Sequence, residues 1–244
     1  MIVCVGLATR DTIYRVPEVP GADGRVVATE RVVAGGGPAA TAAVAIARLG
    51  VPARFVGIVD GDLPGVEVVR MPGRMVESTI LVGPGGERAI VTEEADQFEC
   101  PPDALEDADW VHVDHVGYPA VRGVSDGSSL SVDGGNPIPG LDVSKVGLYA
   151  PNRDDGLRAT LTVVTRGADG CTAYAGDETI EVPGEPVDGL VSTLGAGDVF
   201  HGALLAALVR GLELRDALRA ANRCAALSCR ALDGRSAIPA WEEL

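Results

Sequence analysis

Two glycines and a carboxylate meet at the start of one predicted helix in the last quarter of the sequence. The segment Gly195-Ala196-Gly197-Asp198 runs directly into residues 199–211, where apolar side chains recur at the spacing of one helix face. The first N–H groups of a helix have no partner within it, and the helix dipole adds partial positive charge there. This pattern predicts a turn that binds a phosphate or another anion.

An aspartate in this position also has an ordinary use, because Asp198 alone could simply cap the helix. A second glycine-rich turn, at residues 35–37, favours the functional interpretation. It also opens a predicted helix, since Pro38 suits the first helical position and Gly50 ends the segment.

Together these two turns resemble the signatures of the ribokinase-like, or PfkB, carbohydrate kinase family. The second family pattern is roughly Asp-Thr-x-Gly-Ala-Gly-Asp followed by Phe-x-Gly-Ala, and residues 192–203 depart from it only at Ser192. The first signature matches residues 35–50, except that Thr41 stands where the family usually has an asparagine that contacts the sugar. Further matches fall in the family's order at Asp11, Asn152, 165–170 and 236–239.

The resemblance implies a role for each matching residue. Asp198 is the expected base for a sugar hydroxyl, and the N–H groups of Gly195, Ala196 and Gly197 are expected to stabilise the transferring phosphoryl group. The expected sugar contacts are Asp11, Gly36, Gly37 and Thr41, and the expected nucleotide contacts are Asn152, Thr165, Gly167, Gly170 and Asn222. In simpler interpretations, Asp11 is an exposed loop carboxylate, the two later glycines only form a turn, and Asn222 is a polar helix residue.

The same resemblance implies ATP and Mg²⁺ as cofactors. Asn152 and Asp155 occupy the places of a family Asn-x-x-Glu motif that organises Mg²⁺ and phosphate, with the shorter aspartate in place of glutamate. Ser192 replaces an aspartate that helps to hold K⁺ in family members activated by monovalent cations. Strong activation by K⁺ is therefore not expected.

Short β-rich runs alternate with helical patterns, which predicts an α/β fold with a largely parallel sheet. The runs cover residues 2–6, 55–59, 110–114, 130–133, 146–150 and 160–165. Polar residues follow most of these runs, so we expect them to converge on one cleft beyond the carboxyl ends of the strands. The family resemblance implies a ribokinase-like three-layer domain over residues 1–244, with helices flanking the sheet.

Residues 12–33 and 66–92 lack the helical period, and residues 83–86 form a predicted hairpin turn. We expect these segments to form a small β lid over the cleft. In the resembled family such a lid closes on the sugar and often pairs two subunits, so a homodimer through the lid is expected.

Composition excludes several classes of partner. The formal net charge is −15, which disfavours nonspecific binding to nucleic acid or to anionic membranes. No apolar run approaches the length of a membrane span, and five cysteines without a CxxC pair are consistent with a reducing compartment. We expect a cytoplasmic protein whose partners are a small sugar and ATP.

Competing interpretations remain open at this stage. Residues 123–127 fit the G-x-S-x-G pattern of serine hydrolases but lack the flanking strand and helix, and His112, Asp114 and His115 invite a metal site although they do not share one strand face. A catalytically weak sugar- or nucleotide-binding protein on the same fold is the main alternative, and a nucleoside kinase is another.

The substrate is less defined than the reaction. The turn at residues 35–40 favours a fructose-like or other keto-sugar, while Arg25, Arg31 and Arg88 on the lid could pair with an anionic substituent. The chain is also short for the family, with missing length expected after Asp62, around 125–129 and after Asp155. Either these are true deletions or residues were omitted.

Overall fold

A nine-stranded sheet forms the body of the computed structural model, which describes residues 1–121 and 130–244. Its strand order is β13-β12-β11-β10-β9-β8-β1-β4-β5. Seven of these strands pair in parallel, namely β1 (Ile2–Val5), β4 (Ala53–Gly57), β5 (Glu67–Arg70), β8 (Trp110–Val113), β9 (Leu130–Gly134), β10 (Leu148–Pro151) and β11 (Leu161–Thr165). The mostly parallel α/β fold predicted from the sequence is confirmed.

An antiparallel hairpin completes one edge of this sheet and was missed in the sequence. It consists of β12 (Cys171–Ala175) and β13 (Glu178–Val182), which continue antiparallel from β11. The two residues between these strands are Gly176 and Asp177, and the glycine has a φ of 58°. A Gly-Asp pair between two short β-rich runs is a hairpin pattern, so the sequence did contain this information.

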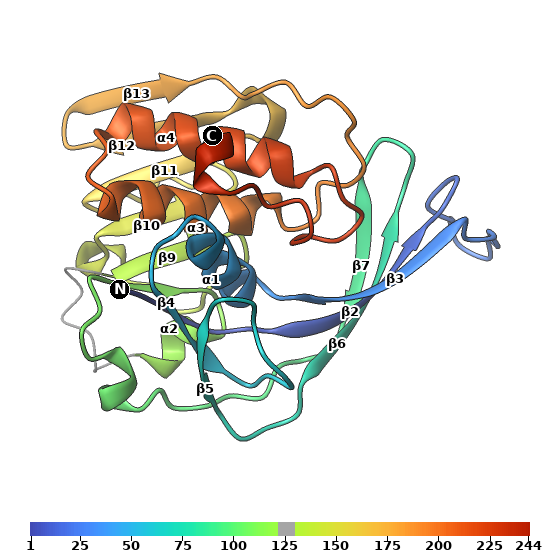
Figure 1. Cartoon of the computed structure of the whole chain (residues 1–244), viewed down its shortest axis with the longest axis horizontal. Helices are drawn as coiled ribbons and strands as arrows, with labels where there is room; N and C mark the ends of the chain where they lie inside the picture. Colours follow the sequence, from blue (N-terminus) through green and yellow to red (C-terminus); the bar gives the residue numbers. More distant parts are fainter. Residues whose placement is uncertain (122–129) are drawn as a thin grey trace.

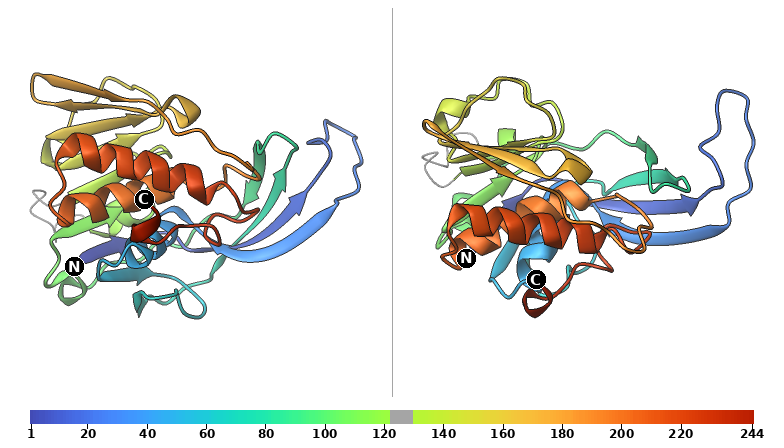
Figure 2. Two further views of the ribbon diagram at one scale, coloured as in Figure 1. Left: turned by 45° about the horizontal axis from the view of Figure 1, so that its top comes forward. Right: turned by 90° about the horizontal axis from the view of Figure 1, so that it is seen from above.

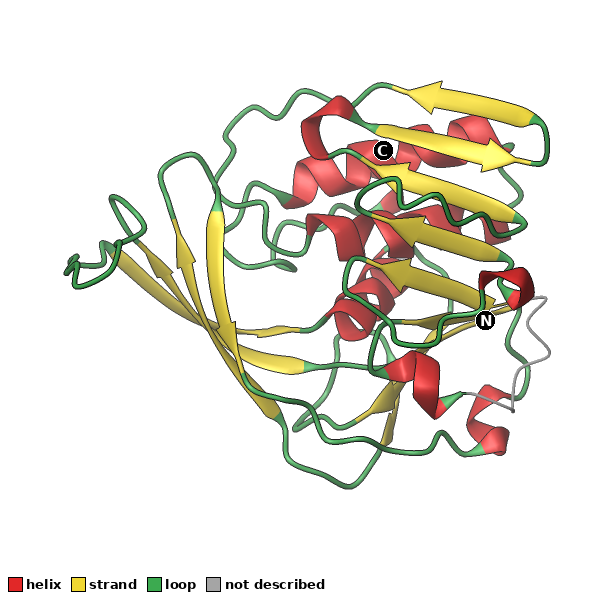
Figure 3. Cartoon of the chain, turned by 180° about the vertical axis from the view of Figure 1, so that it is seen from behind, coloured by secondary structure: helices red, strands yellow, loops and turns green. Residues whose placement is uncertain are grey.

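Three helices cover one face of the sheet: α1 (Pro38–Arg48), α3 (Ala196–Val209) and α4 (Leu214–Ser228) (Figure 1). The larger apolar core lies between them and the strands. Over the opposite face, the described residues form only short segments, α2 (Gly117–Ala120) and the 3₁₀ turns η1 (Pro102–Leu105) and η2 (Val143–Lys145) (Figure 3). The second helical layer of the expected three-layer fold is therefore thin.

Loops without helix account for part of this thinness. The crossover from β4 to β5 uses residues 58–66, and that from β10 to β11 uses residues 152–160; neither contains a helix. Connections between parallel strands usually need a dozen or more residues and a helix. The shortening expected after Asp62 and Asp155 is thus visible, whereas the expected gap around 125–129 and the G-x-S-x-G segment lie outside the described residues.

A four-stranded sheet projects from the body as the predicted lid (Figure 2). Its order is β3-β2-β6-β7, with β2 at Thr9–Arg15, β3 at Glu30–Gly36, β6 at Val76–Val82 and β7 at Arg88–Thr92. The hairpin turn predicted at 83–86 joins β6 to β7, where Gly83 N donates to Glu87 O at 2.9 Å. The expected lid boundary at residue 66 is corrected, because residues 67–70 form β5 in the main sheet.

Two smaller structural elements, η3 (Gly167–Asp169) and η4 (Trp241–Glu243), complete the fold. All five cysteines are buried and free. Within residues 1–121 and 130–244, none of the helices has the length and apolar character that crossing a membrane requires.

Helices α1 and α3 approach closely because both carry small residues where they meet. A Cβ atom built on Gly202 of α3 would lie 2.5 Å from Ala42 O of α1. That distance is far below van der Waals contact, and the atom it meets is backbone. Close packing of these helices brings the two predicted glycine-rich turns to the same end of the sheet.

Substituting Gly202→Ala should therefore destabilise the protein by about 1–3 kcal/mol, because α1 and α3 must separate to admit the methyl group. Gly197→Ala is the matched control, since Gly197 lies on the same helix with open space around its Cα. The control should be neutral or stabilising by up to about 1 kcal/mol from helix propensity alone. Urea unfolding of both variants measures the difference; equal stabilities would contradict this account of the helix contact.

Candidate active site

A cavity of about 550 Å³ lies between the lid and the carboxyl ends of the parallel strands. Residues from both sheets and from the start of α3 line it. It brings together seven of the predicted catalytic, sugar-binding and nucleotide-binding residues: Asp11, Gly37, Asn152, Thr165, Gly195, Gly197 and Asp198. Segments that lie up to 187 positions apart in the chain, from Asp11 to Asp198, thus meet at one site, as the strand-end argument predicted.

The start of α3 presents the expected anion-binding turn to this cavity. Gly195 is the N-cap with a φ of 73°, a conformation that favours glycine, and no side chain caps the helix. Gly197 has open space around its Cα. Asp198 lies in the first turn and lines the cavity, so it is not the helix cap of the simpler interpretation.

The carboxyl of Asp198 holds its proton more tightly than an ordinary aspartate. Burial in the protein, followed by repulsion from Asp133, raises its pKa from 3.8 to about 7. The positive charges of His201 and Arg88 act in the opposite direction but only in part. A carboxylate with a pKa near neutrality is well suited to accepting a proton from a hydroxyl group.

The tip of the lid touches the loop that leads into α3. Thr193 N donates to Gly86 O at 3.1 Å, and Thr193 Oγ1 donates to the same carbonyl at 2.9 Å. Arg88 on β7 donates from Nη1 to Thr193 Oγ1 at 3.1 Å and also lines the cavity. The lid is therefore held over the cavity by Thr193, which lies two positions before Gly195.

The N-terminal glycine turn places Asp11 in the cavity. Gly37 has a φ of 90° and packs so tightly that a Cβ there would lie 2.4 Å from Leu7 O. A Cβ on Gly36 would lie 2.0 Å from Asp11 Oδ2, so only glycine leaves room for this carboxyl. Asp11 is buried, accepts from Thr9 Oγ1 at 2.6 Å, and has a pKa raised by burial. It is not the exposed loop carboxylate of the simpler interpretation.

Thr41 has a different environment from that expected for a sugar contact. It is buried, it is not among the cavity-lining residues, and its Oγ1 accepts from Arg235 Nε at 3.1 Å. Arg235 also donates from Nη2 to Gly36 O at 2.5 Å. A sequence search for sugar contacts had no reason to select Arg235, which joins the C-terminal loop to the first glycine turn.

The predicted nucleotide and magnesium residues divide into two groups. Asn152 and Thr165 line the cavity, and Asn152 Nδ2 donates to Gly135 O at 3.2 Å. Asp155 lies outside the cavity lining, where its two oxygens accept from the Tyr149 hydroxyl at 2.6 Å and from Leu157 N at 3.0 Å.

The side chains at the cavity fit a magnesium ion whose ligands are mainly water and nucleotide phosphates. Among the described residues, no three histidine, cysteine, aspartate or glutamate side chains gather as a metal cluster. Mg²⁺ commonly keeps several waters and binds nucleotide phosphates together with one or two protein oxygens. The Asn152 side chain at the cavity is compatible with that arrangement.

The remaining predicted nucleotide residues stand away from this cavity. Gly170 has a φ of 85° and lies where a Cβ would come within 2.2 Å of Val182 O, which makes it part of a tight turn. Asn222 on α4 donates to Pro183 O at 3.0 Å and so ties the helix to the end of β13. Gly167, with a φ of 58°, has open space around its Cα.

Comparison with known proteins agrees with this geometry. Residues 152–241 match the model of the pfkB family carbohydrate kinase. The chain is therefore similar to PfkB, ribokinase-like carbohydrate kinases, and the family match covers its C-terminal part. An ATP-dependent ribose-1-phosphate kinase from Halopiger xanaduensis is 26% identical over an alignment that covers 97% of this chain and 94% of that protein.

Solved structures show the same fold over nearly the whole chain. A crystal structure assigned as a ribokinase from Agrobacterium tumefaciens is 27% identical, with a TM-score of 0.82 over 99% of this chain and 95% of that one. Arabidopsis thaliana ribokinase, solved with ribose and ATP, has a TM-score of 0.78 at 19% identity and covers 99% and 96%. These matches support ATP-dependent sugar kinase activity as the class of reaction.

The length of one alignment agrees with shortened connections. The match with the ribose-1-phosphate kinase spans 282 positions, whereas this chain has 244 residues, so internal positions of the relative have no counterpart here. The helix-free loops at 58–66 and 152–160 are places where the structure is visibly short.

One buried residue of the cavity, His201, was not selected from the sequence, whereas Asp133 was among the strand-end polar residues expected in the cleft. His201 on α3 and Asp133 at the end of β9 both line the cavity, and His201 Nδ1 lies 3.2 Å from Asp133 Oδ2. His201 follows Asp198 by three positions, which places both on one side of the helix. That spacing was the available clue, but the strand-end partner could not be identified without the fold.

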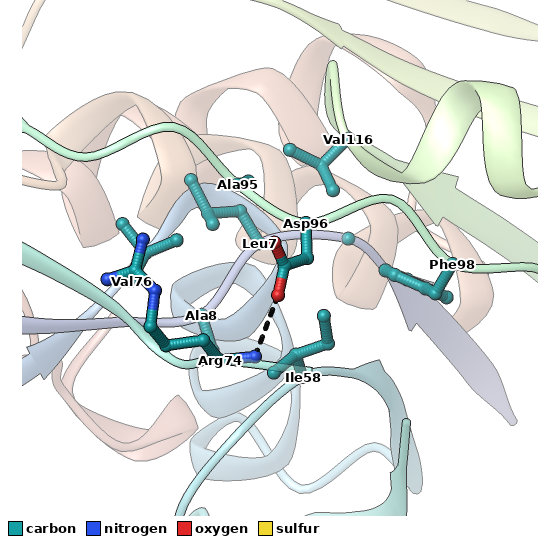
Figure 4. A pocket seen from close by; sticks show the side chains of 10 residues that line it. Leu7, Ala8, Ile58, Arg74, Val76, Ala95, Asp96, Phe98 and Val116 are labelled. Atoms are coloured by element: carbon teal, nitrogen blue, oxygen red, sulfur yellow. Dashed lines mark hydrogen bonds between the residues drawn. The ribbon is translucent and has the colours of Figure 1, made fainter. Parts of the chain in front are cut away.

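A second cavity, of about 10 Å³, lies under the base of the lid (Figure 4). Its lining is mostly apolar, and Asp96 there accepts from Arg74 N at 2.9 Å. A volume of this size holds about one water molecule. It has no room for a substrate.

Asp114 holds the elements around the main cavity together. Its Oδ2 accepts from Leu7 N at 2.8 Å and Ala39 N at 3.2 Å, while Oδ1 accepts from Val116 N and Gly117 N, each at 2.9 Å. The sequence analysis favoured cleft-lining roles for the strand-end polar residues. That interpretation is wrong for Asp114, whose oxygens are taken by backbone, although His115 does line the cavity.

Asp114→Asn should lower the free energy of unfolding by about 3 kcal/mol or more, because the new amide group leaves two buried N–H groups without an acceptor. Asp60→Asn is the control, since this aspartate follows β4 and is exposed. Thermal and urea unfolding measure both variants. If Asp114→Asn were as mild as Asp60→Asn, the anchoring role would be refuted.

Proposed function

We propose that this protein transfers the γ-phosphoryl group of ATP to a hydroxyl group of a small sugar. One observation carries the proposal: Asp198 faces the cavity directly beside the open glycine turn at the start of α3. A base and an anion-binding turn in one place are the two functions that this transfer requires of the protein.

The residues of this chain then act in a defined order. Asp11, which also lines the cavity, holds the sugar hydroxyls through its carboxyl oxygens, aided by the backbone around Gly36 and Gly37. As the oxygen of the attacking sugar hydroxyl bonds to the γ-phosphorus, Asp198 takes the proton of that hydroxyl. The bond from that phosphorus to the bridging oxygen of ADP breaks, and the N–H groups of residues 195–197 stabilise the charge on the transferring group.

The nucleotide occupies the end of the cavity lined by Asn152 and Thr165. Bound Mg²⁺ would neutralise phosphate charge during transfer, with Asn152 as the protein group nearest to that function. Asp155 contributes by fixing Tyr149 beside this region, and Gly167 leaves the backbone of its turn open to the nucleotide. Gly170 and Asn222 support the turn and the helix behind it.

Two observations point to different classes of sugar substrate. The N-terminal turn favours a fructose-like keto-sugar, whereas the relative that covers nearly the whole chain is a ribose-1-phosphate kinase. Arg88 lines the cavity, while Arg31 lies 6.0 Å from the Tyr14 ring on the lid and is not part of the lining. We infer that a pentose or keto-sugar fits the cavity and that a phosphorylated sugar would be recognised through Arg88.

The lid also supports the expected homodimer. Val33, Ile90 and Val91 are exposed apolar residues on β3 and β7, the two edge strands of the lid sheet. Exposed apolar groups on sheet edges are common sites of association. We propose that two copies pair through this sheet, and light scattering of the protein and of Val91→Lys measures it; an unchanged monomer in both would contradict the proposal.

Asp198→Asn should reduce kcat by about 10²- to 10⁴-fold, because a positioned base contributes a factor of this size. The measurement is Mg-ATP-dependent phosphorylation across keto-sugars, aldoses, sugar phosphates and nucleosides. Binding of ATP or sugar without turnover in any of them would instead support a sugar- or nucleotide-binding protein.

The same substitution should not weaken the fold. Because the folded-state pKa of Asp198 is raised from 3.8 to about 7, the stability present below pH 3.8 is lost as pH rises toward 7. The asparagine variant does not suffer this loss, so at pH 8 its melting temperature should equal or exceed that of the unaltered protein. A lower melting temperature would mean that lost activity reflects damage to the fold.

A further inference from the structure

A buried cluster of charged side chains surrounds Asp198 and has no role in the transfer described above. His201 is 5% exposed and Asp133 is 4% exposed, and they form an ion pair at 3.2 Å beside the cavity. Buried charges of this kind are stable only when they are paired. The pair joins α3, which carries Asp198, to the end of β9.

Both ring nitrogens of His201 are buried, and neither makes a hydrogen bond within the part of the chain that the structure describes. Nδ1 lies at ion-pair distance from Asp133, and the ring lines the cavity. The neighbouring histidine, His112 on β8, lies with its ring centroid 5.8 Å away. His112 Nδ1 is 3.1 Å from Ser131 Oγ, and burial lowers the pKa of this histidine to about 3, so it carries no charge at neutral pH.

We propose that His201, held by Asp133, is a positioning residue that neutralises the negative charge beside Asp198 and thereby allows Asp198 to act as a base near neutral pH. Two carboxylates in one cavity repel each other, so one of them would keep its proton unless a nearby cation offset that repulsion. His201, which pairs with Asp133 and follows Asp198 by three positions on α3, supplies that cation. The inference rests on the proposed function, because it concerns the base of that reaction.

The surrounding charges are consistent with this assignment. Attraction to Asp133, and to Asp198 more weakly, raises the pKa of His201 despite its burial, while His201 is the main attraction that lowers the pKa of Asp133 to about 2. The other charged or titratable groups that interact with these three side chains are Arg88 on β7, His112 on β8, Asp114 directly after β8, Tyr149 on β10 and Arg235 of the C-terminal loop. Arg88 and Arg235 lie on the lid and sugar sides of Asp198, so neither takes the place of His201 next to Asp133.

Substitution of His201 and substitution of Asp133 should shift the pH dependence of kcat in opposite directions. The part of the profile that shifts is the acid limb, where kcat falls as Asp198 becomes protonated. His201→Gln removes the cation, so the acid limb for Asp198 should move up by about one pH unit or more, with at least about a 5-fold loss at pH 7 that is largely regained at pH 9. Asp133→Asn removes the repulsion but also part of the attraction that keeps His201 charged, so the limb should move down by a smaller amount. In the double variant the limb should return close to its original position.

Two controls separate charge from structure. His112→Gln removes a buried, uncharged histidine beside the pair, and Ser131→Ala removes only the hydroxyl next to it. Both should leave the acid limb in place. The ionisation of ATP is common to all variants, so it does not affect their comparison.

A second readout does not depend on turnover. The chain has three histidines, so their ring C–H resonances can be resolved by NMR and titrated in the whole protein. The His201 midpoint should lie above 6.5 and fall in Asp133→Asn and, less strongly, in Asp198→Asn. Shifts of the acid limb in the same direction for His201→Gln and Asp133→Asn, or a His201 midpoint unaffected by Asp133→Asn, would overturn the proposal.

The two proposals can fail separately. If no substrate is turned over but His201 titrates as expected, the kinase proposal fails while the coupling between the three side chains stands. If turnover depends on Asp198 but the acid limb ignores both members of the pair, the kinase proposal stands and the positioning role is refuted.

Discussion

The buried carboxylate of Asp114 is the interaction on which the active-site architecture depends. It binds four backbone N–H groups, which belong to the loop after β1, the first turn of α1 and the start of α2. The first helix therefore begins at a fixed position relative to the central strands. Gly37 and Asp11 owe their places in the cavity to this contact, because both lie next to the loop that Asp114 holds.

Charge inside the cavity creates a conflict between stability and catalysis. Asp11, Asp133 and Asp198 all line it, and burial raises the pKa of the first and the last. A chain with a formal charge of −15 has no general excess of cations to offset them. Local partners do so instead: His201 faces Asp133, and Arg235 lies near Asp11 and Asp198 while it binds the backbone at Gly36. The charge balance of the cavity is thus set by a few local contacts.

The thin second layer shows how little of the fold the site requires. The helices α1, α3 and α4 cover one face and carry both glycine turns, whereas the other face is covered by short segments and loops. The connections at 58–66 and 152–160 contain no helix, and the strands that they join still pair in parallel. The cavity survives because its residues come from strand ends, the lid and the start of α3.

The sequence by itself determined the parallel sheet, the lid and both glycine turns, because hydrophobic period and glycine or proline at helix ends are local properties. It also identified Asp198, whose neighbours in the chain are part of its site. It did not separate Asp155, Thr41, Gly170 and Asn222, which bind other protein groups, from the residues that line the cavity. Only the tertiary structure decided that His201 lies beside Asp133 and that Arg235 donates to Thr41, since these contacts join residues 68 and 194 positions apart. The pKa of each charged group depends on this burial and pairing.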